Sequence, residues 1–450
     1  MRFAPLALAL LTSATPAQNN FTARAIPVSV NRQMMGPALT PDGTIGYVCD
    51  QGAVPNVIWE LDVNAASVIR SLGSGSLGTP SGCAVVEGRL YVQDASQVVI
   101  LDRPSGNVLG TIPTPLGRGS MVGEVLYRPL VQRAYAVIGN GIAVQVIDTT
   151  SDRLILNLLH GRFDTPGLGV DAIGQFGYLA DLGGRLRILD LVNGTPVGTV
   201  SYLGTGTIGP YATQVTVDLL RNLVFVGYVD GNSRGAIAEL SGGTLLTRTI
   251  PLGTFTNGLA LTPNLKYLVT GDGTVADALH GTVVGTIPGG GNGEYRGAAA
   301  SLHADRVLFS NFNSAFATLF EGLATFLTPT SPARVGMSAG YRLAVPGDGG
   351  LVYCAAASFG TTPGLPLPDG RVLPLQVDGL FLVSACANNA FFSGFIGVLD
   401  PNGVAGFAVN LPNFGGLAGI AYSVAAVTTD VNAPGGLSIV SNAVTQTIAP

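Results

Sequence analysis

A short hydrophobic segment centred on an aromatic residue recurs along this chain at a nearly constant interval. The aromatic residues are Tyr47, Tyr91, Tyr135, Tyr178, Phe225, Tyr267 and Phe309. Successive copies lie 44, 44, 43, 47, 42 and 42 residues apart. A period of about 40–45 residues built from short strands is typical of a four-stranded propeller blade. The repeat therefore predicts an all-β chain that begins with a seven-bladed β-propeller.

Each copy contains further strand and turn signals around its aromatic residue. A turn precedes the aromatic segment, as in Pro41-Asp42-Gly43, and a second alternating strand follows it. That second strand ends in an acid in the first four copies, at Asp62, Asp102, Asp148 and Asp190. We expect the aromatic rings to pack between neighbouring blades and the acids to accept backbone hydrogen bonds in the next turn.

These motifs resemble the YVTN type of propeller repeat, a WD40-like family. The resemblance covers about residues 36–334 and rests on the Pro-Asp-Gly turn, the Tyr-Val strand and the Ile-Asp or Leu-Asp strand end. It implies the propeller fold and leaves the activity open, because such folds serve many functions. Residues 23–30 (ARAIPVSV) form a strand-like segment before the first blade. We expect this strand to complete the last blade and close the ring within a domain spanning 18–334.

The two ends of the chain differ from the repeat. Residues 1–17 combine Arg2, a short apolar run and small residues before Gln18, which is typical of a cleaved signal peptide. A membrane anchor is the alternative, but spanning a bilayer takes about 20 apolar residues. Residues 335–450 lack the repeat and predict a small β-sandwich of short strands and Pro-rich turns. With Leu399-Asp400-x-x-Gly403 and a closing Ser441-Asn442, this part resembles the C-terminal domain of secreted planctomycete proteins.

Export to an oxidising compartment permits disulfides. Cys354 and Cys386 both lie in the C-terminal part and are the better candidate pair. Cys49 and Cys83 fall on inner strands of neighbouring blades, where pairing depends on their separation. Four buried free thiols are the alternative interpretation.

Charge and composition narrow the possible partners. The formal net charge is −5, charged residues make up 11% of the chain, and no basic run occurs, so a nucleic-acid-binding role is excluded. His160, His280 and His303 lack metal-binding spacing and are expected in turns or on the surface. We therefore predict no metal, no cofactor and no catalytic residue.

Residues that break the repeat are better candidates for a binding site than residues that repeat. The mouth of the central channel is where a propeller usually binds a ligand. At the positions that lead into the innermost strands, five residues depart from the small-residue pattern: Glu124, Tyr211, Asn257, Tyr295 and Arg296. One carboxylate, one amide, one guanidinium and two phenols can orient a polar ligand, whereas ordinary water-filled channel lining is the alternative.

The sequence thus favours a secreted or envelope-located monomer that contacts an extracellular protein or glycan without catalysis and has no transmembrane segment once processed. The alternative is a lactonase-like propeller hydrolase with a metal in its central channel. A further possibility is that the C-terminal domain retains the protein at the cell envelope.

Overall fold

The structure is a computed structural model that describes most of the chain from residue 21 onward. The segments outside the description are 1–20, 29–32, 95–96, 114–123, 139–142, 160–166, 182, 203–210, 230–233, 253–257, 288–294, 302–304, 312–314, 324–325 and 368–370. The expected signal segment 1–17 therefore lies outside the described residues, as do His160 and His303.

The repeat region folds into consecutive four-stranded antiparallel sheets, numbered here in chain order. Sheet 1 contains β2 (Met34–Leu39), β3 (Ile45–Asp50), β4 (Val57–Asp62) and β5 (Ser67–Leu72). Sheet 2 contains β6 (Pro80–Val86), β7 (Arg89–Asp94), β8 (Gln97–Asp102) and β9 (Val108–Pro113). Sheet 3 contains β10 (Val125–Arg128), β11 (Arg133–Ile138), β12 (Ala143–Asp148) and β13 (Arg153–Leu159), with a 3-10 turn at Pro129–Val131.

The next sheets repeat this order. Sheet 4 contains β14 (Leu168–Val170), β15 (Phe176–Ala180), β16 (Arg185–Asp190) and β17 (Thr195–Ser201). Sheet 5 contains β18 (Tyr211–Asp218), β19 (Leu223–Val229), β20 (Gly235–Ser241) and β21 (Leu245–Pro251). Sheet 6 contains β22 (Leu259–Leu261), β23 (Tyr267–Thr270), β24 (Thr274–Asp277) and β25 (Val283–Thr286).

Sheet 7 combines strands from both ends of the repeat region. β26 (Tyr295–Ala300), β27 (Arg306–Asn311) and β28 (Phe316–Glu321) are joined by β1 (Thr22–Pro27), which pairs antiparallel with β28 from Thr22 opposite Glu321 to Pro27 opposite Phe316. Arg24 of β1 also donates to the Val63 carbonyl oxygen of sheet 1 at 2.7 Å. The N-terminal strand therefore connects sheet 7 to sheet 1.

The first strands of these sheets lie next to one another, which makes the arrangement propeller-like. β26, β2, β6 and β10 contact in series, and so do β14, β18, β22 and β26. Between β10 and β14, Arg128 donates to the carbonyl oxygens of Val170 at 2.6 Å and Asp171 at 3.2 Å. The core follows the same plan, because each apolar cluster draws side chains from two neighbouring sheets.

The repeated aromatic residues are all buried, and at most 2% of the surface of each residue is exposed. Several tyrosine hydroxyls also form hydrogen bonds beyond their own sheet. Arg103 of sheet 2 donates to the Tyr47 hydroxyl at 2.9 Å, and the Tyr135 hydroxyl donates to the Gly174 carbonyl oxygen of sheet 4 at 3.3 Å. The rings therefore contribute both apolar area and directed hydrogen bonds to the contacts between sheets.

The strand-end acids stabilise the turns that follow them. Asp102 accepts from the Ser105 backbone N–H at 2.9 Å, and Asp190 accepts from the Val192 and Asn193 N–H groups at 2.9 and 2.8 Å. Hydrogen bonds from the side chain and backbone of Ser105 hold the pKa of Asp102 below its usual value. These carboxylates therefore cap turns, as Asp side chains commonly do.

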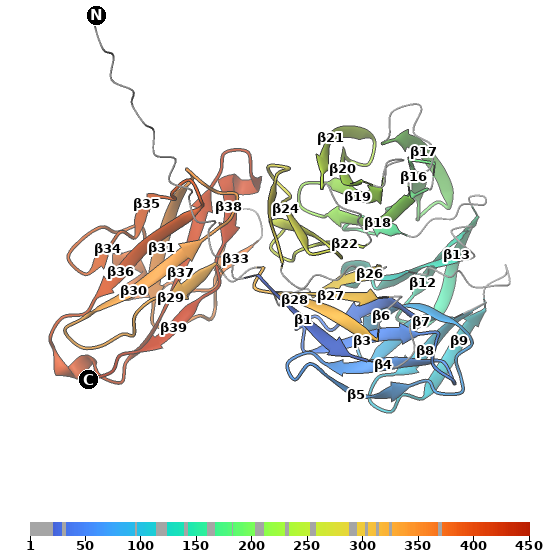
Figure 1. Cartoon of the computed structure of the whole chain (residues 1–450), viewed down its shortest axis with the longest axis horizontal. Coiled ribbons are helices and arrows are strands. Elements are labelled where there is room, and N and C mark those ends of the chain that lie inside the picture. Colours follow the sequence, from blue (N-terminus) through green and yellow to red (C-terminus); the bar gives the residue numbers. More distant parts are fainter. Residues whose placement is uncertain are drawn as a thin grey trace, which may run out of the picture.

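The C-terminal part is an all-β unit of two sheets (Figure 1, orange to red), and its apolar core is continuous with that of sheets 6 and 7. One sheet has the order β29 (Leu327–Pro329), β30 (Ser338–Ala344), β36 (Val404–Asn410) and β34 (Phe392–Ser393). The other has β35 (Ile396–Val398), β31 (Val352–Ser358), β37 (Ala421–Thr429) and β38 (Leu437–Val440), with β39 (Val444–Thr447) also on β37. A hairpin of β32 (Leu365–Pro366) and β33 (Val372–Leu373), helix α1 (Gly379–Ser384) and 3-10 turns at Gly415–Leu417 and Pro434–Gly436 complete it.

The C-terminal sheets begin earlier than the boundary expected at residues 334/335. β29 already pairs with β30, with Leu327 opposite Leu343. This pairing assigns Leu327 to the C-terminal sheets, so the end of the repeat motif does not mark the change of unit. Among the described residues, no helix is both long enough and apolar enough to cross a bilayer.

Candidate functional site

Two groups of polar side chains stand apart from the turn-capping pattern. One lies among the first strands of sheets 3 to 7, and the other lies where sheet 6 meets the C-terminal unit. We call the first the central pair, Glu124 and Gln214, and the second the junction network, which is centred on Lys266.

The central pair connects several first strands. Glu124 directly precedes β10, and its Oε2 accepts from the Leu168 backbone N–H of β14 at 2.8 Å. Gln214 of β18 donates from Nε2 to Oε1 of Glu124 at 3.3 Å and accepts from the Leu259 N–H of β22 at 3.1 Å. Its Nε2 also lies 3.3 Å from the Ala298 carbonyl oxygen of β26. One amide side chain therefore contacts groups on three other first strands.

An irregularity in strand β18 directs the Gln214 side chain toward Glu124. The pairing of β18 with β19 shifts register between Ala212 and Gln214, as in a β-bulge. Bulges change the direction of a side chain and are common near functional positions. Gln214 is buried, and both of its polar side-chain atoms have hydrogen-bond partners. These hydrogen bonds offset the free energy of removing the amide group from water.

Glu124 has an unusual acidity for a glutamate. Burial raises its pKa to about 7, although the Leu168 N–H, the Gln214 amide and the charge of Arg128 all act to lower it. Desolvation exceeds these effects because the two hydrogen-bond donors are neutral and the Arg128 guanidinium donates to the carbonyl oxygens of Val170 and Asp171. Glu124 therefore changes charge near neutral pH.

The structure describes only part of the five-residue set expected at the channel mouth. Glu124 is the member whose side chain is described. Tyr211 and Tyr295 are the first residues of β18 and β26, and Arg296 follows Tyr295, but the description covers their backbone alone. Asn257 lies outside the described residues. Gln214, which the sequence reasoning missed, is the residue that the structure brings to Glu124.

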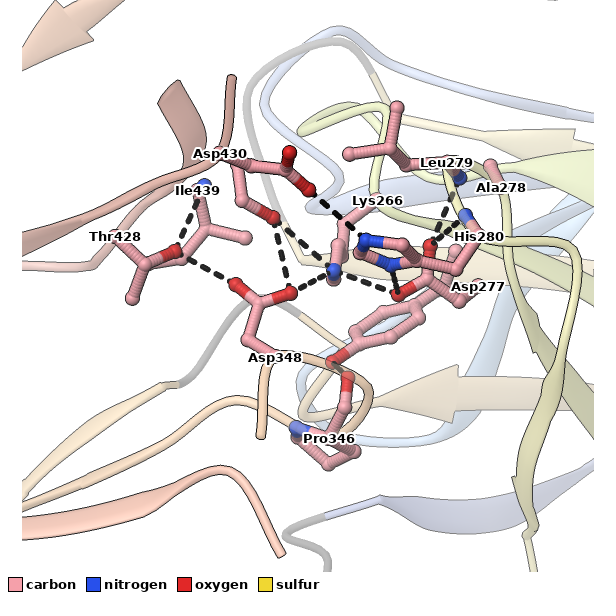
Figure 2. A network of polar contacts seen from close by, with 12 residues as sticks. Lys266, Asp277, Ala278, Leu279, His280, Pro346, Asp348, Thr428, Asp430 and Ile439 are labelled. Atoms are coloured by element: carbon pink, nitrogen blue, oxygen red, sulfur yellow. Dashed lines mark hydrogen bonds and ion pairs between the residues drawn. The ribbon is translucent and has the colours of Figure 1, made fainter. Parts of the chain in front are cut away.

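The junction network surrounds Lys266, the only lysine in the 450-residue sequence (Figure 2). Its side chain is 1% exposed, and its ammonium lies 2.7 Å from Asp277 Oδ2, in contact with Asp348 Oδ1 and 3.1 Å from Ser438 Oγ. Thr428 donates to the other Asp348 oxygen at 2.6 Å. Lys266 and Asp277 come from sheet 6, whereas the other three residues belong to the C-terminal unit.

His280 extends the network toward solvent. Its Nδ1 lies 3.0 Å from Asp277 Oδ2 and its Nε2 lies 2.9 Å from Asp430 Oδ2, so the ring bridges the two units. The hydrogen bond to Asp277 raises the pKa of His280, although desolvation opposes this shift. Burial acts to raise the pKa of Asp277, but His280 and Lys266 outweigh it and hold that pKa far below its usual value.

The donor set of this network resembles a metal site in composition. Asp277, His280 and Asp348 each offer a ligand atom, and these atoms lie within 4.8 Å of one another. The Lys266 ammonium, however, contacts both carboxylates and thereby supplies the positive charge that a metal would bring. The residues present therefore fit an ionic junction and do not fit a metal centre.

The sequence contained a signal for this network. Lys266 stands just before the aromatic residue Tyr267, where the other copies have Gly46, Leu90, Ala134, Gly177, Val224 and Leu308. Asp277 ends its strand as Asp62 and Asp102 do, and its Oδ1 also accepts from the turn at 2.8 and 2.9 Å. Its partners Asp348 and Asp430 lie in another unit, so sequence spacing alone could not connect them.

Comparison with known proteins yields a structural likeness and no relative by sequence. No family model matches the chain, and no curated protein matches it. Among 1638 matching solved chains is hydrazine synthase from Kuenenia stuttgartiensis, with a TM-score of 0.51 and 14% identity over 65% of this chain and 97% of the other. At this identity the likeness concerns the fold alone.

Proposed function

We propose that this chain is an exported, non-catalytic binding protein: a seven-bladed β-propeller closed by β1 and followed by a small β-sandwich. Its ligand is an extracellular glycan or protein with polar groups, bound at the mouth of the central channel. The seven four-stranded sheets of the described chain and the contacts between their first strands support the ring. A rigid ring with variable connecting loops suits binding, because loops can change without disturbing the sheets.

The observation that carries the proposal is the Glu124–Gln214 pair. Its hydrogen bonds join β10, β14, β18, β22 and β26 at the centre of the sheets, so the polar groups there are held in place before any ligand arrives. Binding sites typically combine such a rigid frame with a few convergent polar groups. A glutamate that titrates near neutral pH can accept hydrogen bonds from ligand hydroxyl or amide groups once ionised.

The binding proposal is tested with arrays of glycans and of secreted proteins probed by the labelled full chain. We expect reproducible binding to one ligand class, reduced at least about tenfold by Glu124→Gln, which corresponds to about 1.4 kcal/mol. Glu87→Gln is the matched control, because Glu87 is exposed in the β6–β7 turn and has no place in the central pair. Equal weakening by both variants would show that binding does not involve the channel.

A lactonase-like hydrolase is the second candidate, and the acidity of Glu124 favours it. A carboxyl whose pKa lies near 7 suits general acid–base catalysis at neutral pH. Elemental analysis of the purified protein, together with a lactone and ester panel, separates the two candidates. Stoichiometric calcium or zinc with turnover abolished by Glu124→Ala would establish the hydrolase and overturn the binding proposal.

A further inference from the structure

Two cysteines outside the C-terminal disulfide meet between sheets 1 and 2. Cys49 lies in β3, Cys83 lies in β6, and both side chains are buried, at 0% and 3% exposure. Both Sγ atoms approach the Gly36 carbonyl oxygen, at 3.7 Å from Cys49 and 3.5 Å from Cys83. Burial raises the pKa of the Cys49 thiol, and the adjoining Cys83 thiol raises it further by hydrogen bonding.

The local backbone explains why both sulfurs reach one oxygen. Pairing of β2 with β3 jumps from Met35 opposite Cys49 to Ala38 opposite Tyr47, so Gly36 lies in a bulge outside the regular ladder. The surroundings are apolar, with Met35, Leu77 and Val92 in the same core cluster. A buried thiol with a raised pKa, as at Cys49, is a poor metal ligand and a poor nucleophile, because both roles require the thiolate.

The other two cysteines of the chain form a disulfide. Cys354 and Cys386 are joined by a disulfide that connects β31 to the segment after α1. Disulfides persist in oxidising compartments and are rare in the cytosol. A second pair of adjacent thiols in such a chain therefore meets the same redox conditions.

We propose that Cys49 and Cys83 form a second disulfide that covalently joins sheet 1 to sheet 2. This inference depends on the proposed function in one respect only, because export of the chain supplies the oxidising conditions. Two S–H bonds break and one S–S bond forms, and the two protons and two electrons pass to a disulfide-containing oxidant, which is reduced to two thiols. The exchange takes place during folding, because in the folded chain both thiols are buried away from a soluble oxidant.

Thiol counting tests this bond. The full chain, isolated without reductant, is unfolded in guanidinium chloride and titrated with a thiol reagent. We expect no free thiol, whereas unpaired Cys49 and Cys83 would give two per chain. The Cys354→Ser/Cys386→Ser double variant is expected to give none as well, and Cys49→Ser is expected to give one. Non-reduced peptide mapping should recover the Cys49 and Cys83 peptides as one species lighter by two hydrogens.

Refolding separates a failure of this proposal from a failure of the export proposal. The reduced, unfolded chain is refolded with a glutathione thiol–disulfide mixture. If isolated protein has two free thiols but refolded protein has none, the pairing holds and the compartment is wrong. If refolding restores Cys354–Cys386 and leaves two free thiols, the Cys49–Cys83 bond is overturned.

Discussion

The ammonium nitrogen of Lys266 lies 2.7 Å from Oδ2 of Asp277, and both side chains are buried. Together with Asp348 and His280, this pair connects sheet 6 to the C-terminal unit through charge (Figure 2). The Tyr267 hydroxyl adds a hydrogen bond to the Pro346 carbonyl oxygen at 3.0 Å. The apolar core is continuous across the same boundary, with Tyr267 and Phe326 rings 6.0 Å apart. The last sheets and the C-terminal unit are therefore expected to unfold together.

Replacing the junction lysine should be strongly destabilising. Lys266→Met leaves the Asp277 and Asp348 carboxylates buried without a cation, and breaking a buried ion pair in this way typically costs about 3–5 kcal/mol. Arg24→Met is the control, because Arg24 and its partner Glu321 are 35% and 25% exposed and Glu321 keeps its ion pair with Arg306 at 3.1 Å. We expect the control to cost about 1 kcal/mol or less. Equal losses in chemical denaturation would show that Lys266 is not a junction residue.

The same lysine gives a direct probe of burial. Because the chain has a single lysine, an amine-reactive reagent can modify only Lys266 and the N-terminal amine. With 1% of the Lys266 side chain exposed, we expect the folded protein to react at the N-terminus alone and the unfolded protein to react at both. Peptide mass mapping reads the two sites separately. Lys266 modification at equal rates in folded and unfolded protein would refute the buried junction.

His280 should make the junction sensitive to pH. Its pKa is raised above the unfolded value of about 6.5, so its stabilising contribution is fully present below that value and is lost as pH rises through the folded pKa. The charged groups facing the ring are Asp277, Asp430 and Lys266. We expect His280→Gln to flatten the loss of stability above about pH 6.5. Denaturant midpoints measured at several pH values above and below about 6.5 give the pH dependence of stability for both proteins. Parallel wild-type and variant curves would contradict the prediction.

The N-terminal strand should be required for a stable ring. Deleting residues 18–31 removes β1, uncovers the edge of β28, and exposes a strand edge prone to self-association. We expect a lower Tm and aggregation on heating. Arg24→Ala keeps the β1 backbone but removes the contacts to Glu321 and Val63, and should lower the Tm much less. An unchanged Tm after the deletion would refute closure by β1.

The regular parts of this fold were accessible from sequence because each copy has its own local signals. Tyr47 and Asp102 mark a strand and a turn within a few residues of themselves, and the structure uses them in those ways. The start of the C-terminal sheets at Leu327 was not accessible, because its burial depends on β30 and the distant core. Gln214 was missed for a similar reason: only a bulge in β18 directs it toward Glu124.

Glu124 belongs to the central pair, and burial raises its pKa to about 7. Its raised pKa means that the folded state favours the protonated form, so the contribution of Glu124 to stability is fully present below its ordinary pKa of 4.5 and is lost as pH rises through about 7. Ligand binding at the channel should therefore change across this pH. Glu124→Gln, which cannot ionise, should bind with a flat profile.

The most direct measurement is the affinity of the array-selected ligand for wild type and Glu124→Gln from about pH 5.5 to 8.5, a range that brackets the raised pKa. We expect the wild-type affinity to change with a midpoint near pH 7 and the variant affinity, whether weaker or stronger, to stay constant over the range. Identical pH profiles for the two proteins would contradict ligand binding at Glu124.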